Sequence, residues 1–310
     1  MNNMEEFSIP LSTDIAGNTL SMKGYTFGTG GPKVYIQGGI HGGEVTFWIF
    51  NELFNYLSNK KVNGTITLVP ISNPYAWNQR VYFYTVGKFN LQTAEDWNRG
   101  YPGDNTSLAK RRAKKVMDLV KDYDYSICLH TSRSSIPFSI FTEETRDDAL
   151  IKALGMKYNY LLSNKADDSM MSVLSKSQST FGFEIECGSH DSYNPVFIQQ
   201  VTSAILRFLA YKGFINAEIA QEVEEKILYK AYEKYFSEYS GFLELVKRPA
   251  ENYLKGEELF KTFPSTNYFS PQVIKGKQDG IIIKSLPSTI VWEGDEVLQT
   301  IDMNSVEVIK

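Results

Sequence analysis

The chain has 310 residues, of which 42% are hydrophobic and 22% charged, and its formal net charge is −4. This composition is typical of a globular protein, and the small negative charge argues against a surface for nucleic acid or for an anionic membrane. Residues 1–6 lack the basic start and apolar core of a signal peptide, and no apolar run is long enough to span a bilayer. Cys128 and Cys187 lie in apolar, strand-like runs, so the sequence predicts buried free thiols and a cytoplasmic location.

A glycine-rich turn follows a short predicted strand. Residues 34–36 are apolar, residues 38–43 include four glycines, and residues 45–57 predict a helix packed on a core. His41 and Glu44 therefore lie between the carboxyl end of a strand and the start of a helix, where ligand sites gather in open α/β sheets. An imidazole and a carboxylate held together suit zinc, which commonly takes two His and one Glu. The alternative is an N-capping Glu beside a His that is satisfied by backbone hydrogen bonds.

Strands and helices alternate along the chain up to about residue 235. The sequence predicts strands over residues 65–70, 125–130 and 181–188, and helices over residues 107–120, 147–162, 167–177, 194–214 and 217–235. The helix over residues 107–120 carries a basic run made of Lys110, Arg111, Arg112, Lys114 and Lys115. At helical spacing such a run is more often a solvated face than a binding patch, so a solvated face is predicted.

Two of these strands carry further candidate groups. His130 ends the strand over residues 125–130, at the same kind of strand edge as His41. Along residues 181–188 the side chains alternate, so Glu184 and Glu186 share the face opposite the apolar residues. Two carboxylates on a core-like strand are costly unless they are paired or functional. Glu186 lies nearer the carboxyl end and is the better catalytic candidate, whereas Glu184 is interpreted as structural.

From about residue 238 the pattern changes to short β-rich runs separated by turns. Residues 241–246, 280–284 and 289–292 predict strands, and residues 255–260 resemble residues 293–298. The sequence therefore predicts a catalytic domain over residues 1–236 and a C-terminal β domain over residues 237–310. The second domain is expected to be a small all-β, barrel-like sandwich.

An ordered set of motifs resembles the succinylglutamate desuccinylase/aspartoacylase family within the zinc carboxypeptidase superfamily. Residues 39–44 look like the family's G-x-H-G-x-E, residues 73–76 like N-P-x-A, residues 96–103 like D-L-N-R-x-F-P-G, residues 129–131 like L-H-T, and residues 186–188 like E-x-G. The likeness spans nearly the whole chain, and the ordered set is specific where each motif alone is weak. The resemblance implies an α/β fold of the zinc carboxypeptidase type, with a mixed, mostly parallel central sheet flanked by helices.

Carried over to this sequence, the resemblance implies one zinc ion per chain, held by His41, Glu44 and His130. Glu186 would be the general base and acid. Zinc activates a water molecule and polarises a carbonyl, and a positioned carboxylate can move the proton. His190 is expected in a loop near the mouth of the site and not among the ligands.

The resemblance also implies groups that hold the substrate. Asn98 and Arg99 would bind a substrate carboxylate, and the alternative for this pair is a turn with a surface ion pair. Arg80 is a candidate for polarising the scissile carbonyl, although its spacing to Asp96 is long, and Arg133 is the local alternative.

Two residues depart from the family pattern. Trp97 replaces the usual Leu beside the substrate clamp, which is expected to alter the shape of the pocket. Cys128 stands where the family usually has an acidic residue two positions before the histidine ligand. If that acid supports a ligand in relatives, its loss would weaken metal binding or activity by about 10–100-fold.

The function implied is hydrolysis of an amide bond in a small, carboxylate-bearing substrate such as an N-acyl amino acid. The alternatives are a zinc carboxypeptidase acting on short peptides and a non-catalytic metal- or ligand-binding relative. A lipoyl- or biotinyl-like carrier module is a further interpretation of the C-terminal part, but no lysine stands in a recognisable acceptor turn. The expected partner is a small molecule, not nucleic acid or a membrane, and the sequence leaves homo-oligomerisation open.

Overall fold

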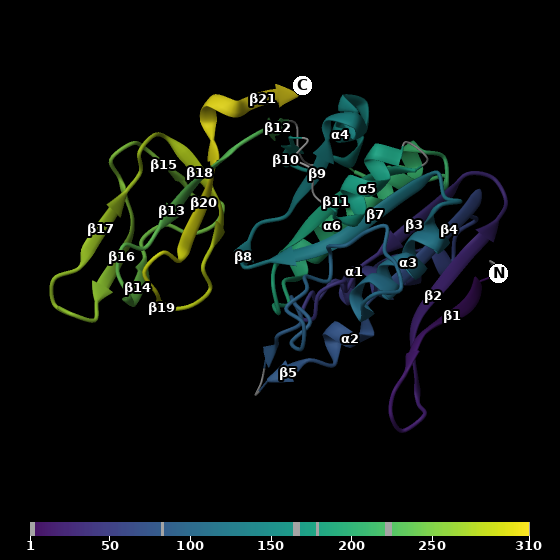
Figure 1. The fold of residues 1–310 in the computed structure, drawn as a ribbon. Helices are drawn as coiled ribbons and strands as arrows, with labels where there is room; N and C mark the ends of the chain where they lie inside the picture. The colour runs from purple at the N-terminus through teal and green to yellow at the C-terminus, as the bar shows by residue number, and fades with distance from the viewer. Residues whose placement is uncertain (1–3, 82–83, 164–167, 178–179, 221–224, 310) are drawn as a thin grey trace.

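A ten-stranded mixed sheet forms the centre of the protein (Figure 1). The structure is a computed structural model and describes residues 4–309 except 82–83, 164–167, 178–179 and 221–224. In order across the sheet, the strands are β1 (Met4–Thr13), β2 (Thr19–Thr29), β4 (Gly64–Ile71), β3 (Lys33–Gln37), β7 (Tyr125–Ser132), β11 (Phe181–Ser189), β9 (Phe138–Thr142), β10 (Tyr158–Leu162), β12 (Lys226–Tyr229) and β21 (Val306–Ile309). The central strands β4, β3, β7 and β11 are parallel to one another. β2 pairs antiparallel with β4, and β1 pairs antiparallel with β2 at the edge of the sheet. The prediction of a mixed sheet in an α/β fold is confirmed.

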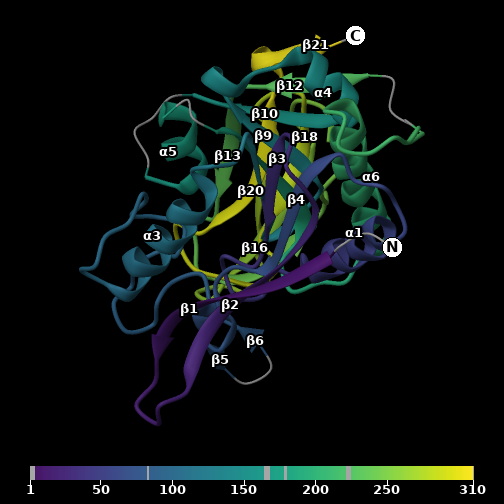
Figure 2. The same ribbon diagram turned by 90° about the vertical axis from the view of Figure 1, so that its right-hand side faces the viewer.

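Helices cover both faces of this sheet (Figure 2). Over one face lie α1 (Phe47–Ser58), α4 (Asp148–Leu154) and α6 (Pro195–Tyr211), and over the other lie α3 (Leu108–Val120) and α5 (Met170–Ser177). Short turns of helix are α2 (Pro74–Trp77), η1 (Glu143–Thr145) and η2 (Met303–Ser305). On β3, Val34 and Ile36 join the core under α1, whereas Tyr35 joins the core under α3. Both faces of the strand are buried, as a covered parallel sheet requires.

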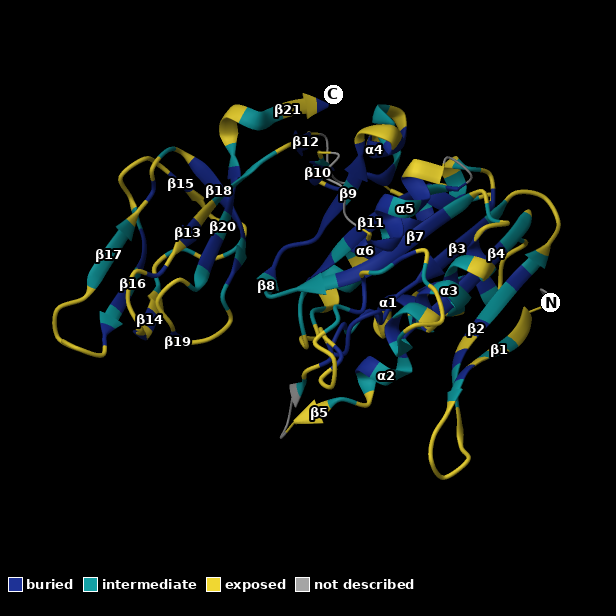
Figure 3. Ribbon diagram, viewed as in Figure 1, coloured by how far each residue is buried: buried dark blue, intermediate teal, exposed yellow. Residues whose placement is uncertain are grey.

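Local sequence explains why the helices begin where they do. The side chain of Asn194 accepts hydrogen bonds from the backbone N–H groups at the start of α6, and Pro195 occupies the first turn. Ser107 caps α3 in the same way. The central strands are buried along most of their length (Figure 3). No helix in the described part of the chain is both long enough and apolar enough to cross a membrane.

The C-terminal part contains two antiparallel sheets. One consists of β13 (Tyr232–Phe236), β20 (Glu296–Asp302), β18 (Gly280–Ser285) and β15 (Asn252–Tyr253), with β8 (Ser134–Ser135) paired to β18. The other consists of β17 (Gln272–Lys275), β16 (Glu258–Pro264), β14 (Gly241–Leu245) and β19 (Ile290–Val291). The two sheets share one apolar core, so they form a sandwich. Among the described residues no strand pairing closes them into a barrel, and the barrel-like part of the prediction is not observed.

The predicted internal repeat corresponds to two equivalent turns. Gly256 and Gly294 both have φ of +86°, a conformation that favours glycine. Each turn leads into a seven-residue strand, β16 after Gly256 and β20 after Gly294. The chain leaves the large sheet after β12 and returns to it with β21, so both ends of the C-terminal part lie beside the large sheet. The domain boundary after residue 236 stays a prediction.

Two predicted helices are wrong in part. The helix over residues 147–162 ends at Gly155, which has φ of +67°, and residues 158–162 form strand β10. Within the predicted helix over residues 217–235, residues 221–224 lie outside the described part, and β12 and β13 occupy most of the remainder. All four residues of β12 are buried, and such a short apolar run cannot be told from a buried helix by periodicity alone. Residue 167, at the start of another predicted helix, is also outside the described part, and that helix begins at Met170.

The basic run on α3 is only partly a solvated face. Arg112 is 1% exposed, and its Nη2 donates to the Trp97 carbonyl at 2.6 Å and to the Tyr101 hydroxyl at 2.8 Å. Arg112 falls on the same helical stripe as Leu108 and Val116, so its position already pointed inward. The solvated-face prediction is therefore wrong for Arg112. The two cysteines are buried and free, as predicted.

A separate short hairpin carries one of the predicted site residues. β5 (Arg80–Val81) pairs with β6 (Tyr84–Thr85), away from the large sheet. Arg80 is exposed on this hairpin.

Candidate active site

Two histidines and a glutamate meet at the carboxyl ends of neighbouring strands. His41 and Glu44 lie on the turn that follows β3, and His130 lies near the end of β7, which pairs in parallel with β3. The tight turn depends on Gly43, which has φ of +80° and whose added Cβ would lie 2.5 Å from His190 Nε2. One ligand atom from each of the three residues lies within 4.8 Å of the others, and all three residues are buried. The structure thus brings together the residues that the sequence predicts as metal ligands.

The contacts within this group require positive charge. His41 Nδ1 and His130 Nδ1 lie 2.8 and 2.9 Å from the same oxygen, Glu44 Oε1. Burial alone would raise the pKa of Glu44, but the two imidazoles lower this pKa below its usual range, so the carboxylate is ionised and only accepts. Burial alone would lower the pKa of His130, whereas the charge of Glu44 raises it well above its ordinary value. Either protons on the two rings or a metal ion between the three side chains can supply this charge.

Asp96 fixes the orientation of His41. Asp96 Oδ1 lies 3.0 Å from His41 Nε2 and accepts from the Asn98 backbone N–H at 2.8 Å, and Oδ2 pairs with Lys88 at 2.9 Å. Burial alone would raise the pKa of Asp96, but its contacts with His41 and Lys88 lower it, so Asp96 is ionised and His41 Nε2 is the donor. A metal ion would then meet His41 at Nδ1. Two imidazoles and a carboxylate with such support form a donor set that fits zinc.

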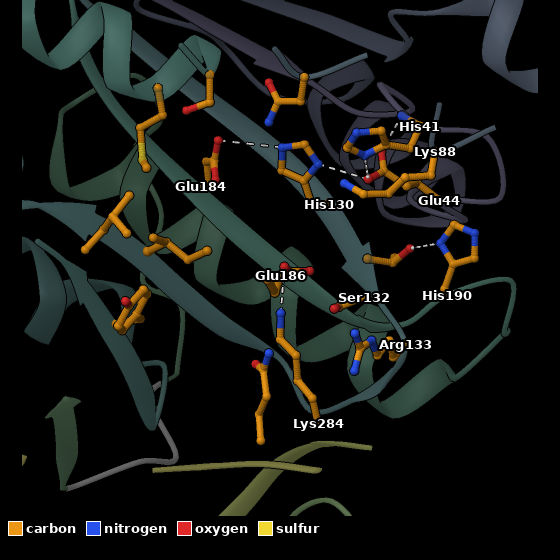
Figure 4. A pocket seen from close by; sticks show the side chains of 18 of the residues that line it. His41, Glu44, Lys88, His130, Ser132, Arg133, Glu184, Glu186, His190 and Lys284 are labelled. Carbon is orange, nitrogen blue, oxygen red and sulfur yellow. Dashed lines mark hydrogen bonds and ion pairs between the residues drawn. The ribbon is translucent and has the colours of Figure 1, made fainter. Parts of the chain in front are cut away.

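Glu186 and Glu184 lie beside the histidines on β11 (Figure 4). In the parallel pairing of β11 with β7, Glu186 is opposite His130 and Glu184 is opposite Cys128. Glu186 Oε1 accepts from Lys284 Nζ at 3.1 Å, while Oε2 is buried without a hydrogen-bond partner in the described part of the chain. Glu184 Oε1 lies 3.7 Å from His130 Nε2, too far for a direct hydrogen bond but close enough for electrostatic attraction. Glu186 therefore has one carboxylate oxygen without a protein partner beside His130, and Glu184 lies on the far side of the His130 ring.

These groups line a cavity of about 570 Å³. This volume is typical of small-molecule sites. Lys284, Pro287 and Gln299 from the C-terminal part form one of its walls. The pairing of β18 with β8, in which Lys284 is opposite Ser135, holds this wall in place. The C-terminal part therefore closes one side of the cavity and limits the size of the molecule that fits.

Asn98 and Arg99 line the same cavity. Asn98 is buried and its Oδ1 accepts from the first backbone N–H of α5 at 3.4 Å, while Arg99 is exposed and donates to the Asn98 carbonyl at 2.8 Å. Arg112 supports this segment from below through the Trp97 carbonyl and the Tyr101 hydroxyl. A buried guanidinium thus positions the segment that carries both residues.

The two candidate arginines for the scissile carbonyl lie in different places. Arg80 lines a second cavity together with Tyr75 and Trp97, and the structure does not bring it to the histidines. Arg133 lines the cavity of the histidines and donates to the Glu296 carboxylate at 3.0 Å.

His190 also lines the cavity of the histidines but does not belong to the group of three. Its Nδ1 lies 3.1 Å from Thr131 Oγ1, and burial lowers its pKa, so the ring is neutral at neutral pH. The sequence predicts His190 in a loop near the mouth of the site, and the structure places it in the turn after β11, among the residues that line the cavity.

The two departures from the family pattern are both buried. Trp97 stacks on Tyr75 with 6.0 Å between ring centroids and lines the second cavity, so its bulk is not directed into the cavity of the histidines. Cys128 accepts from Gln37 Nε2 at 3.3 Å. Burial and the nearby charge of Glu184 raise the pKa of the Cys128 thiol to about 12, so it stays neutral. The carboxylate on this row of the sheet is Glu184, one strand away from Cys128.

Three residues of the site were missed by sequence reasoning. Lys88 and Lys284 pair with Asp96 and Glu186, and Asp96 itself was quoted within a motif without a role. Asp96 stands two residues before Asn98, and that proximity was the available signal. Lys284 is separated from its partner by 98 positions, and no local pattern marks it.

A mixed α/β sheet with a His–Glu–His group at its strand ends, closed on one side by a β sandwich, defines a protein with a candidate metal centre in a small-molecule cavity. The model of the succinylglutamate desuccinylase/aspartoacylase catalytic domain matches residues 30–212, and the chain belongs to this family. The family is one of hydrolases that act on acylated amino acids. A comparison with curated proteins finds no match.

Solved structures share the fold over almost the whole chain. A succinylglutamate desuccinylase/aspartoacylase family protein from Shewanella frigidimarina has a TM-score of 0.89 and 20% identity and covers 100% of both chains. A family protein from Shewanella amazonensis has a TM-score of 0.87 and 20% identity over 98% of this chain and 100% of its own. The ectoine utilization protein EutE (DoeB) from Ruegeria pomeroyi has a TM-score of 0.82 and 16% identity over 96% of this chain and 94% of its own. At these identities the likeness shows the fold alone.

Proposed function

We propose that this protein is a zinc-dependent amidohydrolase that removes the acyl group from a small N-acyl amino acid. The observation that carries the proposal is the meeting of His41, Glu44 and His130 within 4.8 Å at one end of a cavity that Glu186 also lines. Zinc, when bound, would polarise the scissile carbonyl and activate the attacking water. Membership of a family of deacylases supports this reaction.

Glu186 is proposed as the general base and acid. Its unpartnered Oε2 would take the proton of the attacking water and pass it to the leaving amine, a role worth about 10²–10⁴-fold in rate. Lys284 holds the other oxygen at 3.1 Å and so keeps the carboxylate aimed into the cavity. Asn98 and Arg99 are proposed to hold the carboxylate of the substrate, with the guanidinium offering a planar fork to the carboxylate.

For the cation beside the scissile carbonyl, the proposal favours Arg133 over Arg80. Arg133 lines the cavity of the histidines, whereas Arg80 lines the second cavity. Arg133→Met should lower kcat by about 10²–10³-fold, the size of effect seen when a transition-state donor is lost. Arg80→Met is the matched control. A larger loss in the Arg80 variant would return the role to Arg80.

Metal content tests the ligands. His41→Ala and His130→Ala should each strip zinc from the purified protein, measured by elemental analysis after dialysis. His190→Ala is the matched control, because His190 lines the same cavity but is not in the group of three. Unchanged zinc in both ligand variants would remove His41 and His130 as ligands.

Turnover on two panels tests the reaction. N-acetyl and N-succinyl amino acids should be hydrolysed, and Glu186→Gln should keep zinc while losing about 10²–10⁴-fold in kcat. Faster cleavage of dipeptides than of N-acyl amino acids would favour a carboxypeptidase. A zinc-loaded protein that turns over neither panel would be a binding relative and would end the proposal.

A further inference from the structure

One side of the cavity is apolar. Ile140 on β9 lies opposite Glu184 of β11, and Tyr160 on β10 lies opposite Ile140, so the three side chains form a row across the sheet. Leu162 follows two residues after Tyr160 on the same face of β10, and Met171 lies in the first turn of α5. Ile140, Tyr160, Leu162 and Met171, all of which line the cavity, are termed the apolar wall.

The apolar wall lies away from the His–Glu–His group. Glu44 contacts Nδ1 of His130, while Glu184 lies near the opposite ring nitrogen, Nε2 (Figure 4). Ile140 adjoins Glu184 on the side of β11 away from β7, so the wall begins one strand beyond the histidine. If the scissile carbonyl of a substrate lies at the histidines, the part of the substrate that contacts the wall is therefore a group a few atoms away from that carbonyl.

The wall is held in shape by its own packing. Tyr160 lies with its ring centroid 5.2 Å from that of Tyr229 and 4.5 Å from that of Tyr232. Met171 is 2% exposed. Because these side chains are already packed in the structure, an apolar group can dock without ordering them first.

Charge also selects against an acidic group at this wall. The four side chains of the wall are uncharged, and the charged neighbour in the same row is the carboxylate of Glu184. Four cations line the cavity among the described residues. Three are paired with carboxylates, Lys88 with Asp96, Arg133 with Glu296 and Lys284 with Glu186, and Arg99 is the one proposed to hold the carboxylate of the amino acid itself. A second carboxylate placed against the wall would be repelled by the Glu184 carboxylate. Burial of an apolar group there carries no such electrostatic cost.

The wall adjoins the proposed carboxylate clamp. Asn98 Oδ1 accepts from the backbone N–H of Met170, and Met171 is the next residue. The group that touches the wall therefore belongs to the same half of the substrate as the carboxylate held by Asn98 and Arg99. That half is the amino acid released by the reaction.

We propose that the amino acid of the substrate has an apolar side chain, of the size of leucine, methionine or norleucine, and not the acidic side chain of aspartate or glutamate. Its carboxylate binds at Asn98 and Arg99, and its side chain packs against the apolar wall. This inference rests on the proposed function and names the substrate class of the same site.

A homologous series of N-acetyl amino acids tests the inference on the zinc-loaded protein. From alanine through 2-aminobutyrate and norvaline to norleucine, kcat/KM should rise about fourfold for each methylene, because each buried methylene adds that factor to binding of the transition state. N-acetylnorleucine should exceed N-acetylaspartate by roughly tenfold or more, because the aspartate side chain would be buried beside Glu184 without a partner.

Variants test whether the rise of kcat/KM with each methylene depends on the apolar wall. Leu162→Asn should reduce the ratio of kcat/KM for N-acetylnorleucine to that for N-acetylalanine by about tenfold. Leu254→Asn is the matched control, because Leu254 is 63% exposed in the C-terminal part, and it should keep the wild-type ratio. Calorimetric binding of free norleucine and free aspartate to the same proteins gives a readout that does not depend on turnover and should follow the same order.

The outcomes distinguish a failure of the inference about the side chain from a failure of the proposed function. A flat series, or faster hydrolysis of N-acetylaspartate and N-acetylglutamate, would overturn the inference and leave the proposed function standing. The same ratio in the Leu162 and Leu254 variants would also overturn it. Hydrolysis of none of these amides would overturn the proposed function and the inference with it.

Discussion

Replacing Asp96 by asparagine should weaken zinc binding without removing a ligand. Asp96 Oδ1 lies 3.0 Å from His41 Nε2, and the Asp96 side chain is 15% exposed, so this charge-assisted contact is only partly screened by water. A hydrogen bond to a charged group contributes about 1.5–3 kcal/mol and one between neutral groups about 0.5–1.5 kcal/mol, so loss of the charge alone should cost about 1–1.5 kcal/mol. Loss of a group that supports a metal-binding histidine commonly costs about 10–100-fold in metal affinity, which corresponds to about 1.4–2.7 kcal/mol. The two figures overlap near the lower end of this range, so the dissociation constant for zinc should rise by about tenfold.

Asparagine is the informative replacement because it preserves most of the local structure. Its side-chain oxygen, in the place of Oδ1, can still accept from the Asn98 N–H and from His41 Nε2, so the replacement removes the negative charge beside His41 and not the acceptor. The lost contact with Lys88 matters less, because the Lys88 side chain is 57% exposed and an exposed ion pair contributes about 0–1 kcal/mol. The change in zinc affinity therefore reports mainly on His41.

Competition with a chromogenic chelator measures the dissociation constant. Asp118→Asn is the matched control, because Asp118 is exposed and its carboxylate pairs only with Lys114 on the surface of α3 among the described contacts. Thermal unfolding of the zinc-free variants checks that both are folded. A zinc dissociation constant for Asp96→Asn within about twofold of the wild-type value would refute the reasoning that Asp96 supports His41.

Two further predictions concern the protein without substrate. Arg112→Met should lower the free energy of unfolding by about 1–3 kcal/mol, because two buried oxygens lose their donor, whereas Arg111→Met one position away on the exposed side should change it by less than about 0.5 kcal/mol. Equal effects in urea unfolding of the two variants would contradict the assigned role of Arg112. In zinc-free protein, the lowered pKa of Glu44 gives stability that is present above its unfolded value of 4.5 and is lost as the pH falls through the folded value. The raised pKa of His130 gives stability that is present below its unfolded value of 6.5 and is lost as the pH rises through the folded value, so this pair should stabilise the zinc-free protein most between about pH 4.5 and 6.5. Urea unfolding across this range, with no maximum there, would argue against the pair.

Sequence pattern was sufficient where a residue's role depends on its own strand or turn. The alternation along residues 181–188 placed Glu184 and Glu186 on the face opposite Phe183 and Ile185, and the structure puts both apolar side chains in the core under α6. The glycine-rich turn likewise placed His41 at a strand end. Period and turn chemistry are local, so the sequence alone could fix them.

Pattern was insufficient where a role depends on a distant segment. The pattern predicts a helix across β12, whose burial comes from neighbours on both sides, β10 and β21. Lys284 reaches Glu186 only because β18 docks on β8. Each of these depends on tertiary contacts that a local pattern does not record.

The charges around the histidines explain why a divalent cation suits this site. A chain of close contacts runs from Lys88 through Asp96, His41, Glu44 and His130 to Glu184. With both imidazoles neutral, one ammonium stands against three carboxylates, which leaves two negative charges in a largely buried row. A group buried with unbalanced charge is costly, so the row has to gain two positive charges. Two protons on the imidazoles would supply them, and so would one divalent ion held by His41, Glu44 and His130. The strand-end geometry and the charge balance are therefore both compatible with a divalent ion at these three side chains.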